Sequence, residues 1–315
     1  MAELMAEQQG FISFLPDLGL IAATGEDASD FLHNQLTNDV LGLSDDSARL
    51  AGYCSPKGRL LATMLIWKAA DSILLMLPKN LLAATQKRLQ MFVLRAKVKL
   101  EDASDRLSVA AIGLPSGAAF QALPATDYQR GALSGGTLIR MPDAAGFART
   151  LWIGPAQDAQ ALAAALPSGL RQAPPSLWRW TEIQAGLPQV LEATREQFVP
   201  QMVNFELVGG VNFRKGCYPG QEIVARSQYL GKLKRRMLLA SVEAPEALPG
   251  TEVYSESDPG QPCGMIVNAE RGPDERLACL VEIKMEAAEA TIRLGSPSGP
   301  PLQLGTLPYA LEATP

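Results

Sequence analysis

The chain has 315 residues, of which 47% are hydrophobic and 19% are charged. It is therefore long enough for two or three domains and has the composition of an ordinary soluble globular protein. The net charge of −5 gives no global electrostatic reason to expect nucleic-acid binding. No apolar run approaches the length of a bilayer span, and residues 1–17 hold acidic but no basic side chains, unlike a secretory or transit peptide. The expected location is the cytoplasm, away from membranes.

Hydrophobic periodicity and turn residues indicate a mixed α+β fold with mostly antiparallel strands. In chain order they predict a strand at 18–25, a helix within 24–40, a strand–turn–strand at 50–67, a strand at 72–78, a helix at 79–96, strands within 97–113, and helices at 155–167 and 176–187. A mostly irregular stretch then runs to Asn212, and loops of this length are often functional.

The pattern of predicted secondary structure changes near Leu233. Short strand patterns separated by Pro/Gly turns follow to the end, which is typical of a small β-barrel or β-sandwich. We therefore expect two regions, residues 1–236 and residues 237–315, with the second forming a separate β-domain.

Cysteine and histidine positions limit the metal chemistry that the chain can perform alone. The cysteines are Cys54, Cys217, Cys263 and Cys279, without a C-x-x-C pair, and His33 is the one histidine. A zinc or iron–sulfur site needs closely spaced soft ligands, so no resident metal site is expected. His33 lies beside apolar positions of a predicted helix and is interpreted as structural.

Cys217 stands out because of its neighbours. It lies in a glycine-flanked turn, between two cations and the "EIVA" stretch of a predicted helix start. Nearby cations and a helix N-terminus both lower a thiol pKa, so Cys217 can serve as a nucleophile, a metal ligand or a redox group. The alternative is a small apolar residue that simply fits between glycines.

A local excess of basic residues surrounds this motif. Residues 207–236 contain seven Lys and Arg side chains against Glu222 alone, a charge of +6 that leaves −11 for the rest of the chain. Such an island predicts a local anion site, although a solvated strand or helix end explains the "KLKRR" part equally well.

The stretch "KGCYPGQE" resembles the signature of the YgfZ family, Lys-Gly-Cys-Tyr-x-Gly-Gln-Glu. The matching motif residues are Lys215, Gly216, Cys217, Tyr218, Gly220, Gln221 and Glu222. Four further segments resemble parts of the same family: the N-terminal segment to Val40, the "YCSPKGRLLA" hairpin, the "AGLP" helix end, and "LPYAL" (307–311) as a closing strand. The family is similar to the aminomethyltransferase (T protein) of the glycine cleavage system and is understood as a folate-binding group that supports iron–sulfur enzymes.

The resemblance implies both a fold and a ligand. The fold would be a T-protein-like body of two intertwined α+β subdomains around a central opening, plus the C-terminal β-barrel. Tetrahydrofolate would bind in the opening, with Gln184, Lys215, Arg226 and Arg235 near it. Cations of this kind suit the carboxylates of the glutamate tail.

Two departures from the aminomethyltransferases stand out in this sequence. Where those enzymes carry an aspartate pair, one of them catalytic, this chain has Ala62 and Thr63. Where they use a glutamate to contact the pterin, it has Gln184, which can form hydrogen bonds but no charged pair. We therefore expect folate binding without aminomethyltransferase activity.

Three functions are weighed from the sequence. The favoured one is a folate-dependent accessory factor for iron–sulfur proteins, including enzymes that thiolate tRNA, acting through Cys217. The alternatives are a one-carbon (aminomethyl) transferase and a binding module for tRNA or protein without chemistry. Strong direct nucleic-acid binding is not expected, because the overall charge is negative and the basic stretch offers only Tyr229 for stacking on a base.

Overall fold

Two compact units make up the protein in a computed structural model. The described residues are 9–229 and 233–311. The first unit takes the described residues up to Phe31 together with 41–49 and 65–181, and the second takes 32–40, 50–64 and those from Glu182 onward. The chain passes repeatedly from one unit to the other.

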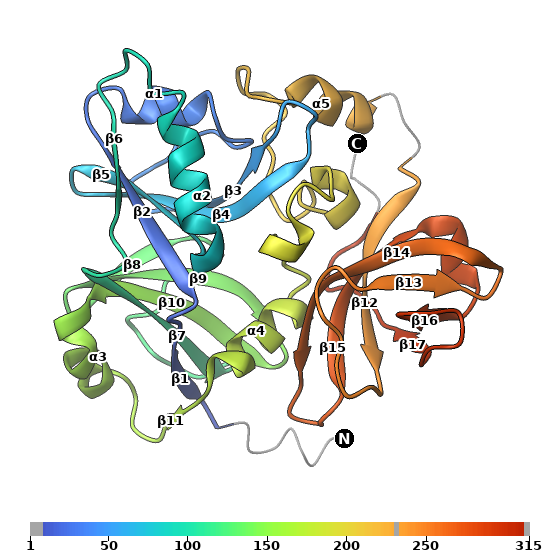
Figure 1. The fold of residues 1–315 in the computed structure, drawn as a ribbon. Helices are drawn as coiled ribbons and strands as arrows, with labels where there is room; N and C mark the ends of the chain where they lie inside the picture. The colour runs from blue at the N-terminus through green and yellow to red at the C-terminus, as the bar shows by residue number, and fades with distance from the viewer. Residues whose placement is uncertain (1–8, 230–232, 312–315) are drawn as a thin grey trace. The chain divides into compact units, whose positions relative to one another are not determined.

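A six-stranded sheet forms one layer of the first unit, in the order β11-β1-β7-β10-β9-β8 (Figure 1). Neighbouring strands are antiparallel except β1 and β11. The buried Trp152 indole donates its N–H to the Leu133 carbonyl (2.8 Å) and packs with Leu162 of α3 in the core. The elements are β1 (Phe11–Phe14), β7 (Leu107–Pro115), β8 (Arg130–Leu133), β9 (Gly136–Ala144), β10 (Phe147–Pro155), β11 (Arg171–Gln172), the 3-10 turn η1 (Ala156–Asp158) and α3 (Ala159–Ala165).

A second antiparallel sheet in this unit has the order β4-β5-β2-β6. Helix α2 packs against β2, β5 and β6 and buries Leu81, Leu82 and Leu89. The helix predicted at 79–96 is shorter than expected, because residues 91–98 fold into successive turns. The elements are β2 (Leu18–Thr24), β4 (Leu60–Ala69), β5 (Ser72–Pro78), α2 (Lys79–Gln90) and β6 (Lys99–Asp102).

Helix α4 (Pro175–Gln184) ends just before Gly186, which adopts a left-handed conformation with φ of 66°. The Tyr309 hydroxyl donates a hydrogen bond to the Gly186 carbonyl (2.7 Å). A Cβ at Gly186 would lie 2.7 Å from the Tyr309 ring, so glycine is required there twice over. The strand expected at 307–311 is wrong, because this segment forms bends that place Tyr309 over the helix end.

The stretch from 188 to 212 is mostly irregular, as predicted, and the irregular chain continues to residue 220, yet it is well anchored. Phe198 and Phe205 are buried, and the Asn204 side chain donates to the Met237 carbonyl (2.7 Å). The regular pieces are the 3-10 turns η2 (Glu192–Thr194) and η3 (Pro200–Val203), followed by α5 (Gln221–Tyr229). A buried irregular segment of this kind is a rigid loop rather than a linker.

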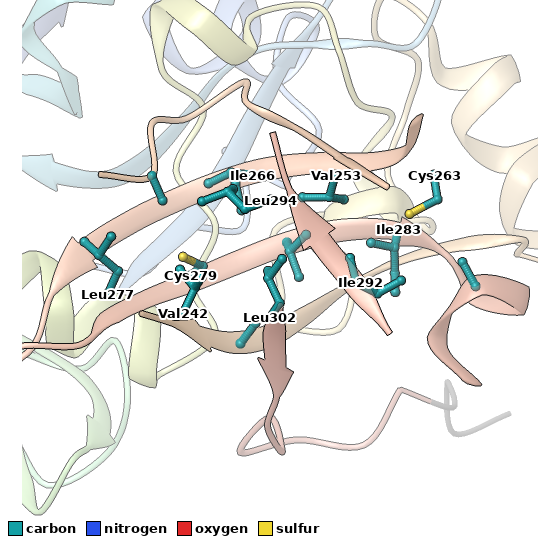
Figure 2. Close-up of a cluster of buried hydrophobic side chains, with 14 residues drawn as sticks. Val242, Val253, Cys263, Ile266, Leu277, Cys279, Ile283, Ile292, Leu294 and Leu302 are labelled. Carbon is teal, nitrogen blue, oxygen red and sulfur yellow. The ribbon is translucent and has the colours of Figure 1, made fainter. Parts of the chain in front are cut away.

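The C-terminal strands form a nearly closed barrel in the order β16-β13-β14-β15-β12-β17. The edge strands meet through a bridge between Arg293 and Pro301, and the interior is filled by aliphatic side chains (Figure 2). Cys263 and Cys279 belong to this core, and burial raises the pKa of the Cys279 thiol to about 12. The elements are β12 (Arg235–Val242), β13 (Glu252–Ser255), β14 (Asp258–Arg271), β15 (Leu277–Lys284), η4 (Met285–Glu289), β16 (Ile292–Leu294) and β17 (Leu302–Leu304).

Two further expectations meet the structure here. The helix predicted within 24–40 is limited to α1 (Ala28–His33), because Leu36 and Thr37 leave the helix to pair with strand β3 (Ala48–Cys54). The division into 1–236 and 237–315 stays a prediction, and β12 spans the proposed boundary. In the part of the chain that the structure describes, no helix is long and apolar enough to cross a membrane.

Candidate functional site

Residues 36–40 hold in place the chain that leads into the signature motif, within the same unit. The Thr37 hydroxyl donates to the Gly210 carbonyl (2.6 Å), and the Asn38 amide donates to the Gly209 carbonyl (2.7 Å). The Asn212 N–H donates in turn to the Thr37 carbonyl (3.0 Å). Buried side-chain and backbone hydrogen bonds thus hold the chain just before the motif in one position.

Two tight turns meet at the motif. Gly58 of the "SPKG" turn and Gly220 of the "CYPG" turn both adopt left-handed conformations, with φ of 71° and 80°. A Cβ on Gly220 would lie 2.6 Å from the Gly58 Cα and even closer to the Ser55 carbonyl oxygen. A Cβ on Gly58 would lie 2.9 Å from the Ile223 Cβ. The two backbones therefore touch only because both residues lack a side chain.

Helix α5 begins directly after this contact and is held by a buried side chain from the preceding irregular segment. The Gln201 amide, which is fully buried, donates to the Val224 carbonyl (2.8 Å). Glu222 and Arg226 lie one helical turn apart and are both exposed, so they share an outward face of the helix. The predicted helix start after Pro219 and Gly220 is confirmed.

Lys215 points into the protein instead of toward solvent. Its ammonium donates to the carbonyls of His33 and Leu36 (2.8 Å for the latter), where helix α1 ends. It also lies 4.8 Å from the centre of the buried Tyr218 ring, a cation–π arrangement. Three N–H groups thus find three partners, and the side chain fastens the motif to the end of α1.

This arrangement places Lys215 in an unusual electrostatic setting. Burial lowers the pKa of its ammonium from 10.5 to about 8, and the nearby Asp39 and Cys217 raise that pKa in opposition to the effect of burial. Asp39 also lies 3.2 Å from Nδ1 of His33. The motif therefore contains a half-buried amine that exchanges its proton near neutral pH, close to a thiol.

Cys217 is exposed, whereas Cys54, Cys263 and Cys279 are buried. Burial raises the pKa of Cys54 to about 12, so that thiol stays protonated at neutral pH. Of the four thiols, the one in the signature motif is thus the one that a reagent or a partner protein can reach.

Two other predicted site residues, Gln184 and Arg235, come from other elements of the fold. Gln184 is the half-buried last residue of α4, and Arg235 on β12 forms a two-point ion pair with the buried Glu282. Within the described residues, no hydrogen bond or ion pair joins either side chain to 213–220. Thr63 is also in use, because its hydroxyl accepts a hydrogen bond from the Val190 N–H (3.0 Å).

The basic island is not one block of free charge. Lys215 is turned inward, Arg235 pairs with Glu282, and the buried Arg236 pairs with Glu206, a carboxylate just outside the window that was counted. Arg214, Arg226 and Lys234 remain exposed, while Lys232 lies outside the described residues. The expectation of a local anion site with a charge of +6 is corrected accordingly, because three of the seven cations already hold internal partners.

Sequence reasoning missed the contribution of His33 and Asp39. Nε2 of the imidazole lies 3.7 Å from where a Cβ of Gly216 would be, and the Asp39 carboxylate raises the pKa of the Lys215 ammonium. A signal was present in the sequence, because the chain's one histidine and an aspartate lie close together in the N-terminal segment that resembles the family. The fold was needed to show that this segment packs against the motif.

Replacing Gly220 with alanine should unfold or displace the motif turn. Gly209 is the matched control, because its φ is 81° but a Cβ there would meet nothing within 4 Å. Gly209→Ala should cost about 1 kcal/mol for the left-handed backbone alone. Gly220→Ala should cost a further ~1–3 kcal/mol, because backbone atoms cannot move aside. Urea unfolding measures both, and equal losses would contradict the turn contact.

The lowered pKa of Lys215 predicts a specific dependence of stability on pH. From about pH 8 to pH 10.5, the unfolded chain holds a proton that folded Lys215 has released, so the wild type gains stability as pH rises. Over this pH range, the unfolding free energy of the wild type should therefore increase relative to that of Lys215→Met. Arg214→Met, at an exposed neighbour, is the control. A difference that does not change with pH would contradict the buried position of the ammonium.

Comparison with known proteins supplies the context for this site. No protein-family model matches the chain. It is 28% identical over 240 residues to the tRNA-modifying protein YgfZ of Vibrio atlanticus (strain LGP32), covering 75% of this chain and 71% of the relative. It is 29% identical over 227 residues to the protein of that name from Yersinia pseudotuberculosis serotype IB (strain PB1/+), covering 71% and 68%.

Among solved structures, the glycine cleavage system aminomethyltransferase T of Bartonella henselae superposes with a TM-score of 0.76. The superposition covers 98% of this chain and 88% of that chain at 16% sequence identity. The predicted fold class is therefore confirmed as aminomethyltransferase T-like. The resemblance inferred from the motif is confirmed as well: the chain is a homologue of the YgfZ proteins.

Proposed function

We propose that this protein binds tetrahydrofolate and supports iron–sulfur enzymes, including enzymes that thiolate tRNA, through Cys217. The observation that carries the proposal is the contrast among the four cysteines: Cys217 is exposed on a rigidly held turn, and the other three are buried. The proposal is also supported by the relatives, which are named tRNA-modifying proteins.

The turn suits a thiol that must act on something outside the chain. Gly216 beside Cys217 is exposed and has no side chain, so it does not block a molecule that approaches the sulfur from that side. The loop is anchored on both sides, by Lys215 at the end of α1 and by Gly220 against Gly58. A thiol held in this way keeps its position while it reacts, which reduces the entropy lost on reaching the transition state.

In the proposed folate site, Gln184 offers an amide to the pterin and Arg226 offers an exposed guanidinium to the glutamate tail. Lys215 and Arg235, which the sequence also suggested, already hold internal partners. For these two residues to bind the ligand, the carbonyl contacts of Lys215 or the Glu282 ion pair would have to open. The proposal therefore rests mainly on Gln184 and Arg226.

Two alternative functions receive less support. An aminomethyltransferase needs an acid–base group where this chain has Ala62 and Thr63, and the Thr63 hydroxyl is engaged by the Val190 N–H. A tRNA-binding module needs free positive charge, and three of the seven cations of the basic island are engaged internally. The accessory role is the function that uses the accessible thiol.

Tetrahydrofolate should bind the purified protein, and Arg226→Gln should weaken that binding by about 10–100-fold, the loss expected for one charge-assisted hydrogen bond. Arg214→Gln, at another exposed arginine, should leave the affinity nearly unchanged. Binding should also weaken with added salt. Isothermal titration calorimetry measures these effects, and the absence of both heat and stabilisation at millimolar folate would overturn the folate assignment.

Cys217 should react fastest with iodoacetamide, and Cys217→Ser should fail to restore iron–sulfur enzyme activity in a bacterial strain that lacks its own YgfZ. Cys263→Ala is the control, because it removes a thiol from the barrel core without exposing a polar group. If Cys217→Ser restores full activity and Cys217 reacts no faster than the other thiols, the residue only packs the turn and the proposed role is wrong.

A further inference from the structure

The segment that contains helix α2 is a second basic stretch in this acidic protein. Residues 79–100 contain no acidic side chain and six basic ones: Lys79, Lys87, Arg88, Arg95, Lys97 and Lys99. The turns that follow the helix expose three large apolar side chains, with Met91 at 65%, Phe92 at 42% and Leu94 at 88% of full exposure. We refer to residues 91–94 as the apolar tip; α2 is the teal helix in Figure 1.

Leu94 combines two features that are both unfavourable to the folded chain alone. It has a φ of 43°, in the left-handed region where glycine and asparagine are preferred. Its side chain is also almost completely exposed, so it gains nothing from burial. Glycine would be accommodated here at lower cost, because it adopts this φ without strain. Neither feature favours a leucine at this position in the folded chain alone.

The apolar tip is held in place by its own backbone. The N–H of Phe92 donates to the Leu89 carbonyl (2.9 Å), and the N–H of Ala96 donates to the Val93 carbonyl (2.8 Å). Val93 is buried beneath the turn and anchors it to the unit. The exposed side chains thus project from a preorganised turn, which reduces the ordering cost of binding.

Charges of both signs surround the tip. Lys97 pairs with Glu26 (2.7 Å), and its backbone N–H donates to the Asp27 carboxylate (2.7 Å). Lys87 and Arg95 are exposed on the same segment, so the net charge beside the tip is positive. An apolar centre inside a polar rim of mixed sign is the usual anatomy of a protein–protein interface.

We infer that the apolar tip is a docking knob, which inserts Leu94 into an apolar pocket with an acidic rim on a partner protein. The inference rests on the proposed function in one respect, since it takes the partner to be the enzyme that the protein supports. Met, Phe and Arg are enriched at the centres of such interfaces, and the exposed Lys and Arg side chains complement an acidic rim.

A protein partner fits the tip better than RNA or a membrane surface does. RNA offers phosphates and base faces, which would engage the cations and Phe92 but leave Met91 and Leu94 without apolar contacts. An anionic bilayer would accept the apolar side chains, but its uniform negative surface would face the Glu26 and Asp27 carboxylates as well as the cations, whereas a pocket rim can place its carboxylates against Lys87 and Arg95 alone. An acidic-rimmed protein pocket satisfies both the apolar side chains and the mixed rim.

The experiment compares Leu94→Gly and Leu94→Asp with Leu41→Asp, a control at a leucine of the same unit that is 50% exposed. Leu94→Gly should leave the urea midpoint unchanged or raise it, because the backbone strain is relieved. Both Leu94 variants should keep wild-type tetrahydrofolate affinity and Cys217 alkylation rate, yet lower complementation of the deletion strain at least about tenfold, while Leu41→Asp complements fully. Complementation by Leu94→Asp equal to that of the wild type would overturn the inference.

A photoreactive amino acid at position 94 identifies the occupant in living cells, whatever the result of complementation. The expected result is a cross-link to an iron–sulfur or tRNA-modifying enzyme that is lost when Arg95→Glu is added. Cross-linking only to a second copy of this chain would overturn the inference. So would binding of bulk tRNA, or of phosphatidylglycerol–phosphatidylcholine vesicles, that Leu94→Asp abolishes. A Cys217→Ser protein that fails in the cell but still forms the expected cross-link separates docking from the proposed chemistry.

Discussion

The contact between Gly58 and Gly220 is the constraint on which the candidate site depends. It joins two turns that are distant in the sequence, and it works only while both residues lack a side chain and hold a left-handed backbone. Helix α5 begins directly after Gly220, and its Ile223 lies against Gly58. A single close approach of two backbones thus converts two ordinary turns into one rigid surface.

Lys215 completes that surface from the inside. A half-buried ammonium is costly to desolvate, and the carbonyls of His33 and Leu36 with the Tyr218 ring offset part of the cost. The residual cost appears as the lowered pKa. The same side chain that fastens the loop therefore carries an exchangeable proton close to the exposed thiol.

Sequence reasoning succeeded where local rules decide the structure. The "SPKG" and "CYPG" turns, the α5 start and the C-terminal strands follow from Pro, Gly and alternating apolar residues, and the structure confirms them. It failed where distant residues decide. The helix expected within 24–40 ends at His33 because Leu36 and Thr37 pair with β3. Three of the seven cations of the basic island hold internal partners, namely backbone carbonyls for Lys215 and the Glu282 and Glu206 carboxylates for the two arginines. Charge counted along a sequence window omits partners that only the fold supplies.

The distribution of the four thiols shows how one chain separates structure from reactivity. In Cys54, Cys263 and Cys279, burial raises the pKa, which keeps these sulfurs protonated and makes them small apolar packing groups. Cys217 is not buried, because it lies between Gly216 and Gly220 on the outer face of the loop. The inner face is occupied by Lys215 and Tyr218. Moving the sulfur to position 218 would bury it, and moving it to position 215 would remove an anchor. The position of the thiol within the motif is therefore set by which neighbours must face inward, and its accessibility is a consequence of how the loop is anchored.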